Sequence, residues 1–318
     1  MSKFAIGIDI GGTNTKFGVV DRDGNILEQD RILTNGHPTV QGFINELFDK
    51  ISPMIERAGK KSDFAGIGMG APNGNYYTGN IEHAANLKWK GIVPMASMMS
   101  EKFGLRVKLT NDANAAAMGE MIYGCAKEMK HFITITLGTG VGSGIVVDGK
   151  IVLGHDGFAG ELGHVVIRPG GRLHKGTGIK GSLEAYASAT GVRETALEIL
   201  EQEPNTKSLL RDFPPDEITS QTVFDCAVKG DAVAMKIFEF TGQILGEALA
   251  NFIMFSSPEA IVLFGGLTKA GDLILNPTIK AMEANLIQVF KNKVKVIFSE
   301  LKEADAAILG ASALVWEE

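Results

Sequence analysis

Cysteine is scarce in this chain of 318 residues. Its two cysteines, Cys125 and Cys226, lie far apart and form neither a metal-ligand nor a redox spacing. Isolated thiols are typical of a protein in a reducing cytosol and not of a disulfide-stabilised secreted domain. We therefore expect a cytoplasmic protein.

Long apolar runs and an excess of positive charge are missing too. No run of about 18 apolar residues occurs, and residues 1–8 lead straight into a strand pattern, so we expect neither a membrane span nor a signal peptide. The 31 Lys and Arg residues against 37 Asp and Glu give a net charge of −6. A general nucleic-acid binder would need a basic face, so this class is disfavoured. An anionic ligand is still allowed, because backbone N–H groups can bind phosphate without net positive charge.

Glycine, in contrast, is plentiful, and the first glycine cluster forms a turn. Residues 4–10 have the pattern of a buried strand, 11–16 (Gly-Gly-Thr-Asn-Thr-Lys) that of a turn, and 17–20 that of a returning strand. Strand-turn-strand order excludes a P-loop and a dinucleotide fingerprint. The glycines allow backbone N–H groups to face a ligand. The alternative is a plain hairpin with a solvated lysine.

A second glycine turn repeats the first about 127 residues later. Residues 131–137 predict a strand, 138–144 a turn and 145–153 hairpin strands, and both copies continue into a Val-Val-Asp segment. A chain of this length is expected to hold about two domains. The repeat therefore predicts an internal duplication into two α/β lobes. Two Gly-Thr hairpins facing each other across a cleft would clamp a polyphosphate.

Asn111 and Asp112 lie where a predicted strand (residues 105–109) passes into a predicted helix (residues 113–123). An Asp in this position is a good helix N-cap, which is the alternative to a functional role. A long irregular loop over residues 73–91 also favours function, because such loops are uncommon in compact domains. The remaining expected helices span residues 40–58 with Pro53 inside, 94–103, two within 220–255, 273–290 and 305–316. The remaining expected strands span residues 26–33, 64–71, 259–264 and 294–298.

Three glycine motifs carry a resemblance to a known superfamily. Asp9–Thr13, Leu137–Gly144 and Phe264–Gly266 are similar to the phosphate and adenosine motifs of the actin, Hsp70 and sugar-kinase superfamily. Within it, Gly160-Glu-Leu-Gly-His164, Glu184 and Asn111-Asp112 resemble the ROK family (repressors, open reading frames, kinases). With Ala71-Pro-Asn73 and Ala85–Trp89, the chain most resembles the ROK glucokinases over essentially its whole length.

The resemblance implies an α/β fold of two duplicated actin-like ATPase lobes with an interlobe cleft. Residues 1–117 would form the smaller lobe, 118–304 the larger one, and the helix within 305–318 would pack back on the first. It also implies phosphorylation by ATP of the 6-hydroxyl of a hexose, most closely glucose, in a homodimer or dimer of dimers. The alternatives are an N-acetylmannosamine, N-acetylglucosamine or fructose kinase, and a sugar-responsive ROK repressor. The repressor is disfavoured because we see no N-terminal helix-turn-helix, and Asp112 argues against a non-catalytic sugar sensor.

The resemblance assigns roles to individual residues. Asp112 would be the base that deprotonates the sugar hydroxyl, and the other substrate-binding residues would be Asn111, Glu161, His164, Glu184 and Gly70. Mg²⁺ would travel with ATP and face Asp9 through water. The ATP site would comprise Asp9, Gly11, Gly12, Thr13, Asn14, Thr15, Lys16, Gly138, Thr139, Gly140, Gly265 and Gly266. Carboxylates suit proton transfer, and Asn, Glu and His suit a ring of hydroxyls.

One stretch departs from the family pattern. ROK proteins usually carry Cys-x-Cys-Gly-x-x-Gly-Cys-x-Glu after the Gly-His pair, and here the cysteine positions hold Lys175, Thr177 and Ser182. Thiolates bind zinc well, whereas hydroxyls and an ammonium do not. We therefore expect no structural zinc, with the loop over residues 168–181 held by hydrogen bonds instead.

Overall fold

A computed structural model describes residues 2–316 of the chain. The chain divides into two compact units by its contacts. Unit 1 comprises the described residues within 1–130, 144–160 and 299–318, and unit 2 comprises residues 131–143 and 161–298. The lobe boundary expected between residues 117 and 118 stays a prediction.

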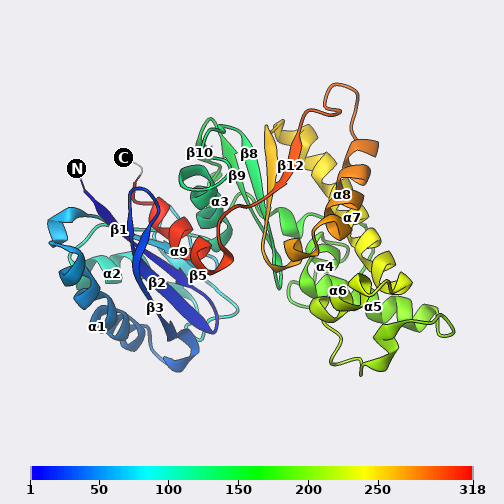
Figure 1. The fold of residues 1–318 in the computed structure, drawn as a ribbon. Coiled ribbons are helices and arrows are strands. Elements are labelled where there is room, and N and C mark those ends of the chain that lie inside the picture. The colour runs from blue at the N-terminus through cyan, green and yellow to red at the C-terminus, as the bar shows by residue number, and fades with distance from the viewer. Residues whose placement is uncertain (1, 317–318) are drawn as a thin grey trace. The chain divides into compact units, whose positions relative to one another are not determined.

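Unit 1 is built on a five-stranded sheet in the order β3-β2-β1-β4-β7. Its strands are β1 (Phe4–Ile10), β2 (Asn14–Asp21), β3 (Ile26–Leu33), β4 (Phe64–Gly70) and β7 (Val107–Thr110) (Figure 1). The first three pair antiparallel as hairpins, whereas β1, β4 and β7 run parallel. The carboxyl ends of these three parallel strands therefore meet at one edge of the sheet.

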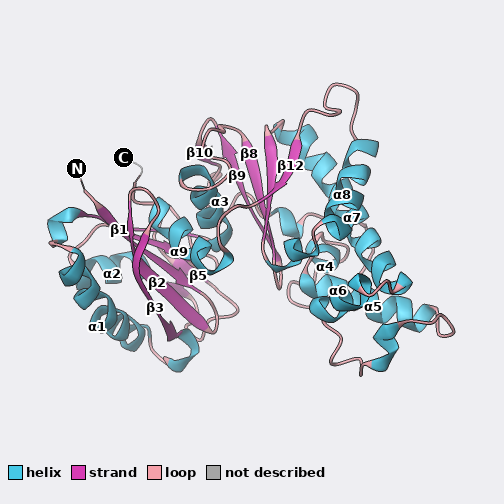
Figure 2. Ribbon diagram, in the orientation of Figure 1, coloured by secondary structure: helices cyan, strands magenta, loops and turns pink. Residues whose placement is uncertain are grey.

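Side chains of β1 alternate between the two faces of the sheet. Ile6, Ile8 and Ile10 join a core cluster with the apolar faces of α1 (Val40–Ala58) and α2 (Met95–Phe103). Gly7 faces the other way, against α9 (Glu303–Ala313), which also packs on α3 (Asp112–Ile122). Figure 2 shows the helices of unit 1 in relation to this sheet. The result is an α/β/α sandwich.

A pair of glycines allows α9 to lie close to the sheet. Gly7 on β1 and Gly68 on β4 are register partners. A Cβ atom at Gly7 would collide with the carbonyl oxygen of Ile308, and one at Gly68 with that of Ala311. We call this pair the glycine furrow. Its lack of side chains lets the helix backbone contact the strands directly.

Unit 2 contains a parallel core of β8 (Phe132–Leu137), β11 (Ala260–Phe264) and β12 (Lys295–Phe298). The whole second sheet has the order β10-β9-β8-β11-β12, and the division between the units runs through β9 (Val141–Val147), with β10 (Lys150–Ile151) in unit 1. Its helices are α4 (Glu184–Ala187), α5 (Ala189–Gln202), α6 (Ser220–Val228), α7 (Ala232–Ser256) and α8 (Asp272–Ala284). Each sheet thus has hairpin strands followed by parallel strands, and the expected α/β class with two repeated halves is confirmed.

Several expected boundaries were wrong in detail. Residues 14–16 belong to β2 because Thr15 and Lys16 pair with Ile10 and Asp9, and residues 141–144 belong to β9, so both glycine turns are shorter than expected. α8 ends at Ala284, where the side-chain amide of Asn285 donates back to the carbonyl of Ala281. Pro53 lies within an unbroken α1.

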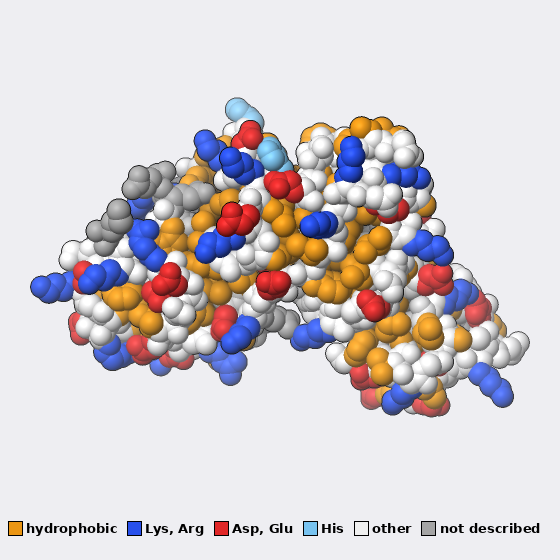
Figure 3. All heavy atoms as spheres, turned by 45° about the horizontal axis from the view of Figure 1, so that its top comes forward, with side chains coloured by type: hydrophobic (Ala, Val, Ile, Leu, Met, Phe, Trp, Pro, Cys, Tyr) orange, Lys and Arg blue, Asp and Glu red, His pale blue; other side chains and the backbone are white. Residues whose placement is uncertain are grey.

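The small elements and the surface complete the description. Short strand β5 (Ile81–Glu82), in the middle of the long loop after β4, pairs antiparallel with β6 (Ile92–Val93), which follows the loop. Among the described helices, none combines the length and apolar character needed to span a lipid bilayer. On the face drawn in Figure 3, side chains of Lys and Arg are interspersed with those of Asp and Glu.

Candidate active site

The carboxyl edge of the first sheet gathers the predicted residues of unit 1. Asp9 pairs with Gly70 across β1 and β4, and Gly70 pairs with Thr110 across β4 and β7. Asn111 and Asp112 follow directly. A Cβ atom built on Gly70 would lie 3.7 Å from Cα of Asp112 and 3.8 Å from Oδ1 of Asp9. Gly70 therefore separates the two aspartates and keeps the space between them free of a side chain, where open α/β sheets usually bind ligands.

The N-cap of α3 is Asn111 and not Asp112. Oδ1 of Asn111 accepts a hydrogen bond from the backbone N–H of Asn114 at 2.6 Å. Asp112 is the first residue of the helix, and its Oδ1 accepts from the N–H of Ala113 at 2.9 Å. The capping interpretation of Asp112 thus fails, and its carboxylate is exposed to solvent and available to a ligand.

Ionisation of the two aspartates at this edge of the sheet is less favourable than in water, so both pKa values are raised. Desolvation raises the pKa of Asp112, and hydrogen bonds from backbone N–H groups oppose this rise. Desolvation is the larger cause and repulsion from Asp112 the smaller cause of a rise in the pKa of Asp9 to about 6. The positive charge of Lys16 acts in the opposite direction and lowers this pKa. A carboxylate whose charged form is made less favourable by desolvation has the character of a general base.

The Gly11-Gly12 turn lies beside this pair. The N–H of Gly11 donates to the carbonyl of Asn14 at 3.0 Å and closes the turn. A Cβ atom at Gly12 would lie 3.0 Å from the carbonyl oxygen of Asn86, so the long loop returns to contact the glycine turn. Thr13 and Asn14 are exposed and can reach a ligand.

The two other polar residues of this segment face different surroundings. The hydroxyl of Thr15 is buried and shares a hydrogen bond of 2.7 Å with the hydroxyl of Thr34. It is therefore already engaged inside the fold. Lys16 is paired in register with Asp9, and its ammonium lowers the pKa of that carboxyl. The attraction between Lys16 and Asp9 makes Lys16 more than a solvated surface lysine.

In unit 2, the second glycine turn lies at the carboxyl ends of two neighbouring parallel strands. The N–H of Gly138 donates to the carbonyl of Gly140, and the carbonyl of Gly138 accepts from Ala189, the first residue of α5. The hydroxyl of Thr190 donates to the carbonyl of Thr139. Hydrogen bonds thus join the turn to the start of α5.

Gly265 and Gly266 lie on the neighbouring strand end. β8 and β11 pair in parallel, with Thr136 opposite Phe264. Gly265 has a φ of 107°, and a Cβ atom there would lie 2.6 Å from the carbonyl of Leu137. Only glycine tolerates both conditions. Nothing lies within 4 Å of a Cβ atom built on Gly138 or Gly266, so these two positions border open space.

The predicted sugar-binding residues of unit 2, Glu161, His164 and Glu184, lie on segments that contact Val141. Its backbone N–H donates to Oε2 of the buried Glu184 at 2.7 Å. Its carbonyl packs on Gly163, the middle of the short helical turn Leu162–His164, and leaves no room for a side chain there. Nε2 of His164 lies 3.9 Å from Oε2 of Glu161. In the part of the chain that the structure describes, Nδ1 of His164 is buried without a hydrogen-bond partner, as a ligand-binding nitrogen would be.

The loop at the altered cysteine positions is a hydrogen-bonded hairpin. Val166 pairs with Ser182, and Leu173 with Lys180. Nδ1 of His174 shares a 2.9 Å hydrogen bond with the hydroxyl of Thr177, and Nε2 of the same ring lies 3.0 Å from Oε1 of Glu184. No cluster of three or more His, Cys, Asp or Glu suited to a metal ion occurs among the described residues. This donor set does not fit tetrahedral zinc.

Arg172 anchors this hairpin to α4 and α5. Its guanidinium donates to both oxygens of Glu198 at 2.8 and 2.6 Å and to the carbonyl of Ala185 at 2.7 Å. It also lies over the ring of Tyr186, 4.6 Å from its centre. The same Tyr186 hydroxyl accepts from the backbone N–H of Arg172 at 2.7 Å. One half-buried arginine thus ties the loop to the helix that begins with Glu184.

The sequence interpretation missed Arg172, the His174–Glu184 contact, Asn86 at the glycine turn, and the helix α5. The helix had a readable signal, because Ser188 caps it and Val192, Ala196 and Ile199 have helical spacing. The other three depend on loops that return from distant positions in the sequence, which spacing alone does not reveal.

Comparisons with known proteins agree with this geometry. The sequence profile of the ROK family matches residues 5–318. A glucokinase of Halalkalibacterium halodurans is 35% identical over 99% of this chain and 96% of its own length. A ROK family glucokinase of Streptomyces griseus, crystallised with glucose and AMPPNP, superposes with a TM-score of 0.80 at 32% identity, covering 99% of this chain and all of that one. A xylose repressor of Caldicellulosiruptor bescii is 28% identical over 98% of this chain but 77% of the repressor.

Proposed function

The chain belongs to the ROK family, and on that premise we propose that it uses ATP to phosphorylate the 6-hydroxyl of glucose. The glucokinase relative and the glucose- and AMPPNP-bound structure support this proposal. The observation that carries it is the placement of Asp112 beside Gly70 and Asp9 at the carboxyl edge of the first sheet. The presence of Asp112 at this point argues against a regulator that only binds sugar.

Asp112 is the general base of the proposed reaction. Its carboxylate accepts the proton of the 6-hydroxyl while the hydroxyl oxygen attacks the terminal phosphorus of ATP. The leaving group is ADP, so one O–P bond forms and one breaks. A base works best when its pKa lies near the working pH, and desolvation moves the pKa of Asp112 upward, in that direction.

The sugar-binding side chains offer both donors and acceptors. The side-chain oxygen of Asn111 is used by the helix cap, so its NH₂ group is left to donate to a hydroxyl. Nδ1 of His164 has no partner among the described residues and can pair with a second hydroxyl. Glu184 is held by Val141 and His174, and each carboxylate oxygen retains a further lone pair for the sugar. Glu161 completes the proposed set.

The glycine turns are the proposed phosphate sites. The exposed Thr13 and Asn14 and the turn at Gly138–Gly140 offer polar groups without bulky side chains. The open surface beside Gly266 suits adenosine. When bound, ATP supplies the phosphoryl group and Mg²⁺ neutralises its charge. Asp9 fits a role near Mg²⁺, because this cation prefers oxygen ligands and a poorly hydrated carboxylate gains from a nearby cation.

A coupled assay of ADP release over a panel of hexoses tests the proposal. We expect the highest kcat/KM with glucose, and lower values with mannose, fructose, N-acetylglucosamine and N-acetylmannosamine. A higher kcat/KM for an N-acetylhexosamine would overturn glucose as the preferred substrate, while the proposed kinase activity would stand. Binding of sugars without any ADP release would overturn the kinase and identify a sensor.

A further inference from the structure

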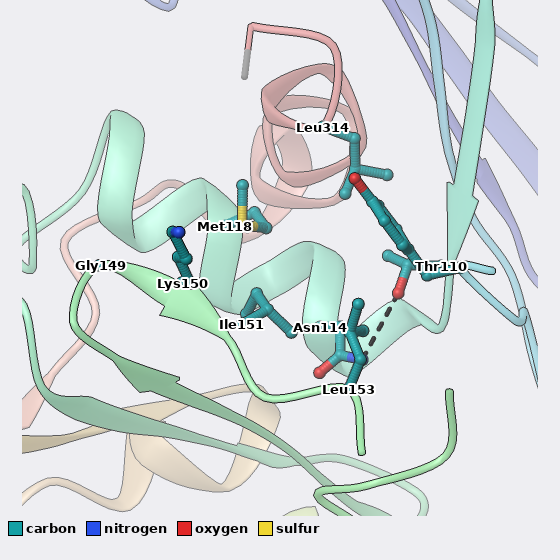
Figure 4. Close-up of a pocket in the computed structure, with 9 residues that line it drawn as sticks. Thr110, Asn114, Met118, Gly149, Lys150, Ile151, Leu153 and Leu314 are labelled. Atoms are coloured by element: carbon teal, nitrogen blue, oxygen red, sulfur yellow. Dashed lines mark hydrogen bonds between the residues drawn. The ribbon is translucent and has the colours of Figure 1, made fainter. Parts of the chain in front are cut away.

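Unit 1 contains a cavity that lies apart from the residues assigned above. Its volume is about 450 Å³, and it borders the outer edge of the first sheet at β7. Four regions of the sequence line it: the loop after β4, the end of β7 with α3, the β9–β10 hairpin with the residues that follow it, and the residues after α9. Its lining residues are Tyr76, Thr110, Asn114, Met118, Gly149, Lys150, Ile151, Leu153 and Leu314 (Figure 4).

The cavity has apolar walls and one polar end. Met118 and Leu314 are fully buried and belong to one apolar cluster, against which Ile151 packs. Figure 4 shows Asn114 and Thr110 together at one end, joined by a hydrogen bond, with Lys150 at a distance from them. This amphipathic lining is typical of a small-molecule site.

Asn114 places a buried hydrogen-bond acceptor without a partner at the polar end of the cavity. Its side chain is 1% exposed. Its Nδ2 donates to the hydroxyl of Thr110 at 3.4 Å, a long bond, and within the described residues its Oδ1 has no hydrogen-bond partner. A buried acceptor without a donor is costly, and native proteins rarely retain one. A ligand that carries an N–H or O–H group would satisfy it.

We propose that this cavity binds a small neutral amphiphile with an apolar body about the size of a fused bicyclic ring and one hydrogen-bond donor directed at Oδ1 of Asn114. A cavity of about 150 Å³ holds one benzene, so a cavity of about 450 Å³ admits a fused bicyclic ring with room to spare. The cavity is distinct from the proposed sugar site. It nevertheless adjoins it, because Asn114 and Met118 lie on the helix whose first residue is Asp112.

Indole and 1-methylindole form a matched pair of probes, since the methyl group removes the donor and keeps the apolar rings. Binding is followed by NMR on protein labelled with ¹³C at the methionine methyl groups, with the Met118 signal assigned from Met118→Leu. We expect indole to shift the Met118 signal saturably and 1-methylindole to bind about tenfold more weakly, which corresponds to about 1.4 kcal/mol.

Two tryptophan variants on the same hairpin locate the site. Ile151→Trp fills the cavity and should abolish the shift, whereas Val147→Trp, at an exposed position outside the lining, should retain it. No saturable Met118 shift with indole in the wild-type protein would overturn the site. Equal affinities for the two probes would overturn the role of Asn114. Neither result depends on kinase activity, so both are independent of the proposed function.

Discussion

At the scale of single residues, Asp112 carries the sharpest prediction. Asp112→Asn keeps the size of the side chain and its bond from Ala113 but removes the base. We expect kcat to fall about 10²–10⁴-fold while the dissociation constant for glucose, measured by calorimetry, changes little. Asp23→Asn, in the exposed turn after β2, is a matched control that should behave like the wild type. Near-native turnover in a folded Asp112→Asn protein would refute the assignment.

The raised pKa of Asp9 predicts that the stability of the folded protein depends on pH. Its folded pKa of about 6 exceeds the ordinary value of 3.8, so between these values the folded state binds more protons than the unfolded state. The contribution of Asp9 to stability is therefore fully present below about pH 4 and is lost as the pH rises through about 6, by up to about 3 kcal/mol.

Asp9→Asn should consequently make the ligand-free protein more stable than the wild type at pH 7.5, and by a smaller margin at pH 4.5. Urea unfolding at both pH values measures the difference. Because the variant also removes the carboxylate proposed to face Mg²⁺, we expect a gain in stability together with a loss of activity. A variant that is less stable at pH 7.5 would contradict the unfavourable charge of Asp9, which arises from burial first and from repulsion by Asp112 second.

At the scale of secondary-structure elements, the glycine furrow sets how closely α9 packs. Gly68→Ala places a methyl group against the carbonyl of Ala311, which is backbone and cannot move aside cheaply. We expect a loss of roughly 1–3 kcal/mol in the free energy of unfolding. Gly36→Ala, where the new methyl would meet only ordinary van der Waals contact, should be nearly neutral. Equal effects of the two substitutions would argue against close packing of α9.

The hairpin at residues 165–182 tests whether hydrogen bonds replace zinc. We expect purified protein to contain far less than one zinc per chain by elemental analysis, and chelation to leave activity intact. Arg172→Ala should destabilise the loop and raise KM for the hexose, because Arg172 fixes the segment that leads to Glu184. Arg193→Ala removes a more exposed arginine of α5 and serves as the control. Stoichiometric zinc whose removal unfolds the loop would overturn this prediction.

Elements with a regular apolar pattern could be predicted from the sequence, and contacts between distant loops could not. The apolar run of β1 and the helical spacing of apolar residues in α1 reflect burial, and both patterns are encoded locally. The interaction of Thr15 with Thr34, of Gly12 with Asn86, and of His174 with Glu184 depends on where loops return in space. The N-cap is Asn111, whereas the alternative interpretation from the sequence placed it at Asp112, because both side chains can cap a helix.

At the scale of the whole molecule, sugar binding should be visible as a rise in thermal stability. A ligand that binds only the folded state, at 100 times its dissociation constant, stabilises it by about 2.7 kcal/mol. We expect D-glucose to raise the melting temperature by a few degrees in the wild type and in Asp112→Asn. L-glucose has the same composition and the same effect on the solvent, and it is the control. An equal rise with both enantiomers would show a solvent effect instead of a site.

The position of α9 also determines when unit 1 can finish folding during synthesis. β1 and β4 leave the ribosome well before α9, the helix that covers their glycine furrow, because β4 ends at residue 70 and α9 begins at residue 303. At about 5–20 residues per second, translation of the sequence between β4 and α9 lasts roughly 12–50 s. Throughout that time the nascent protein exposes one face of its first sheet to solvent. Codon-dependent pauses late in the message should therefore affect the yield of folded protein. Chaperones that bind exposed strands should affect this yield too.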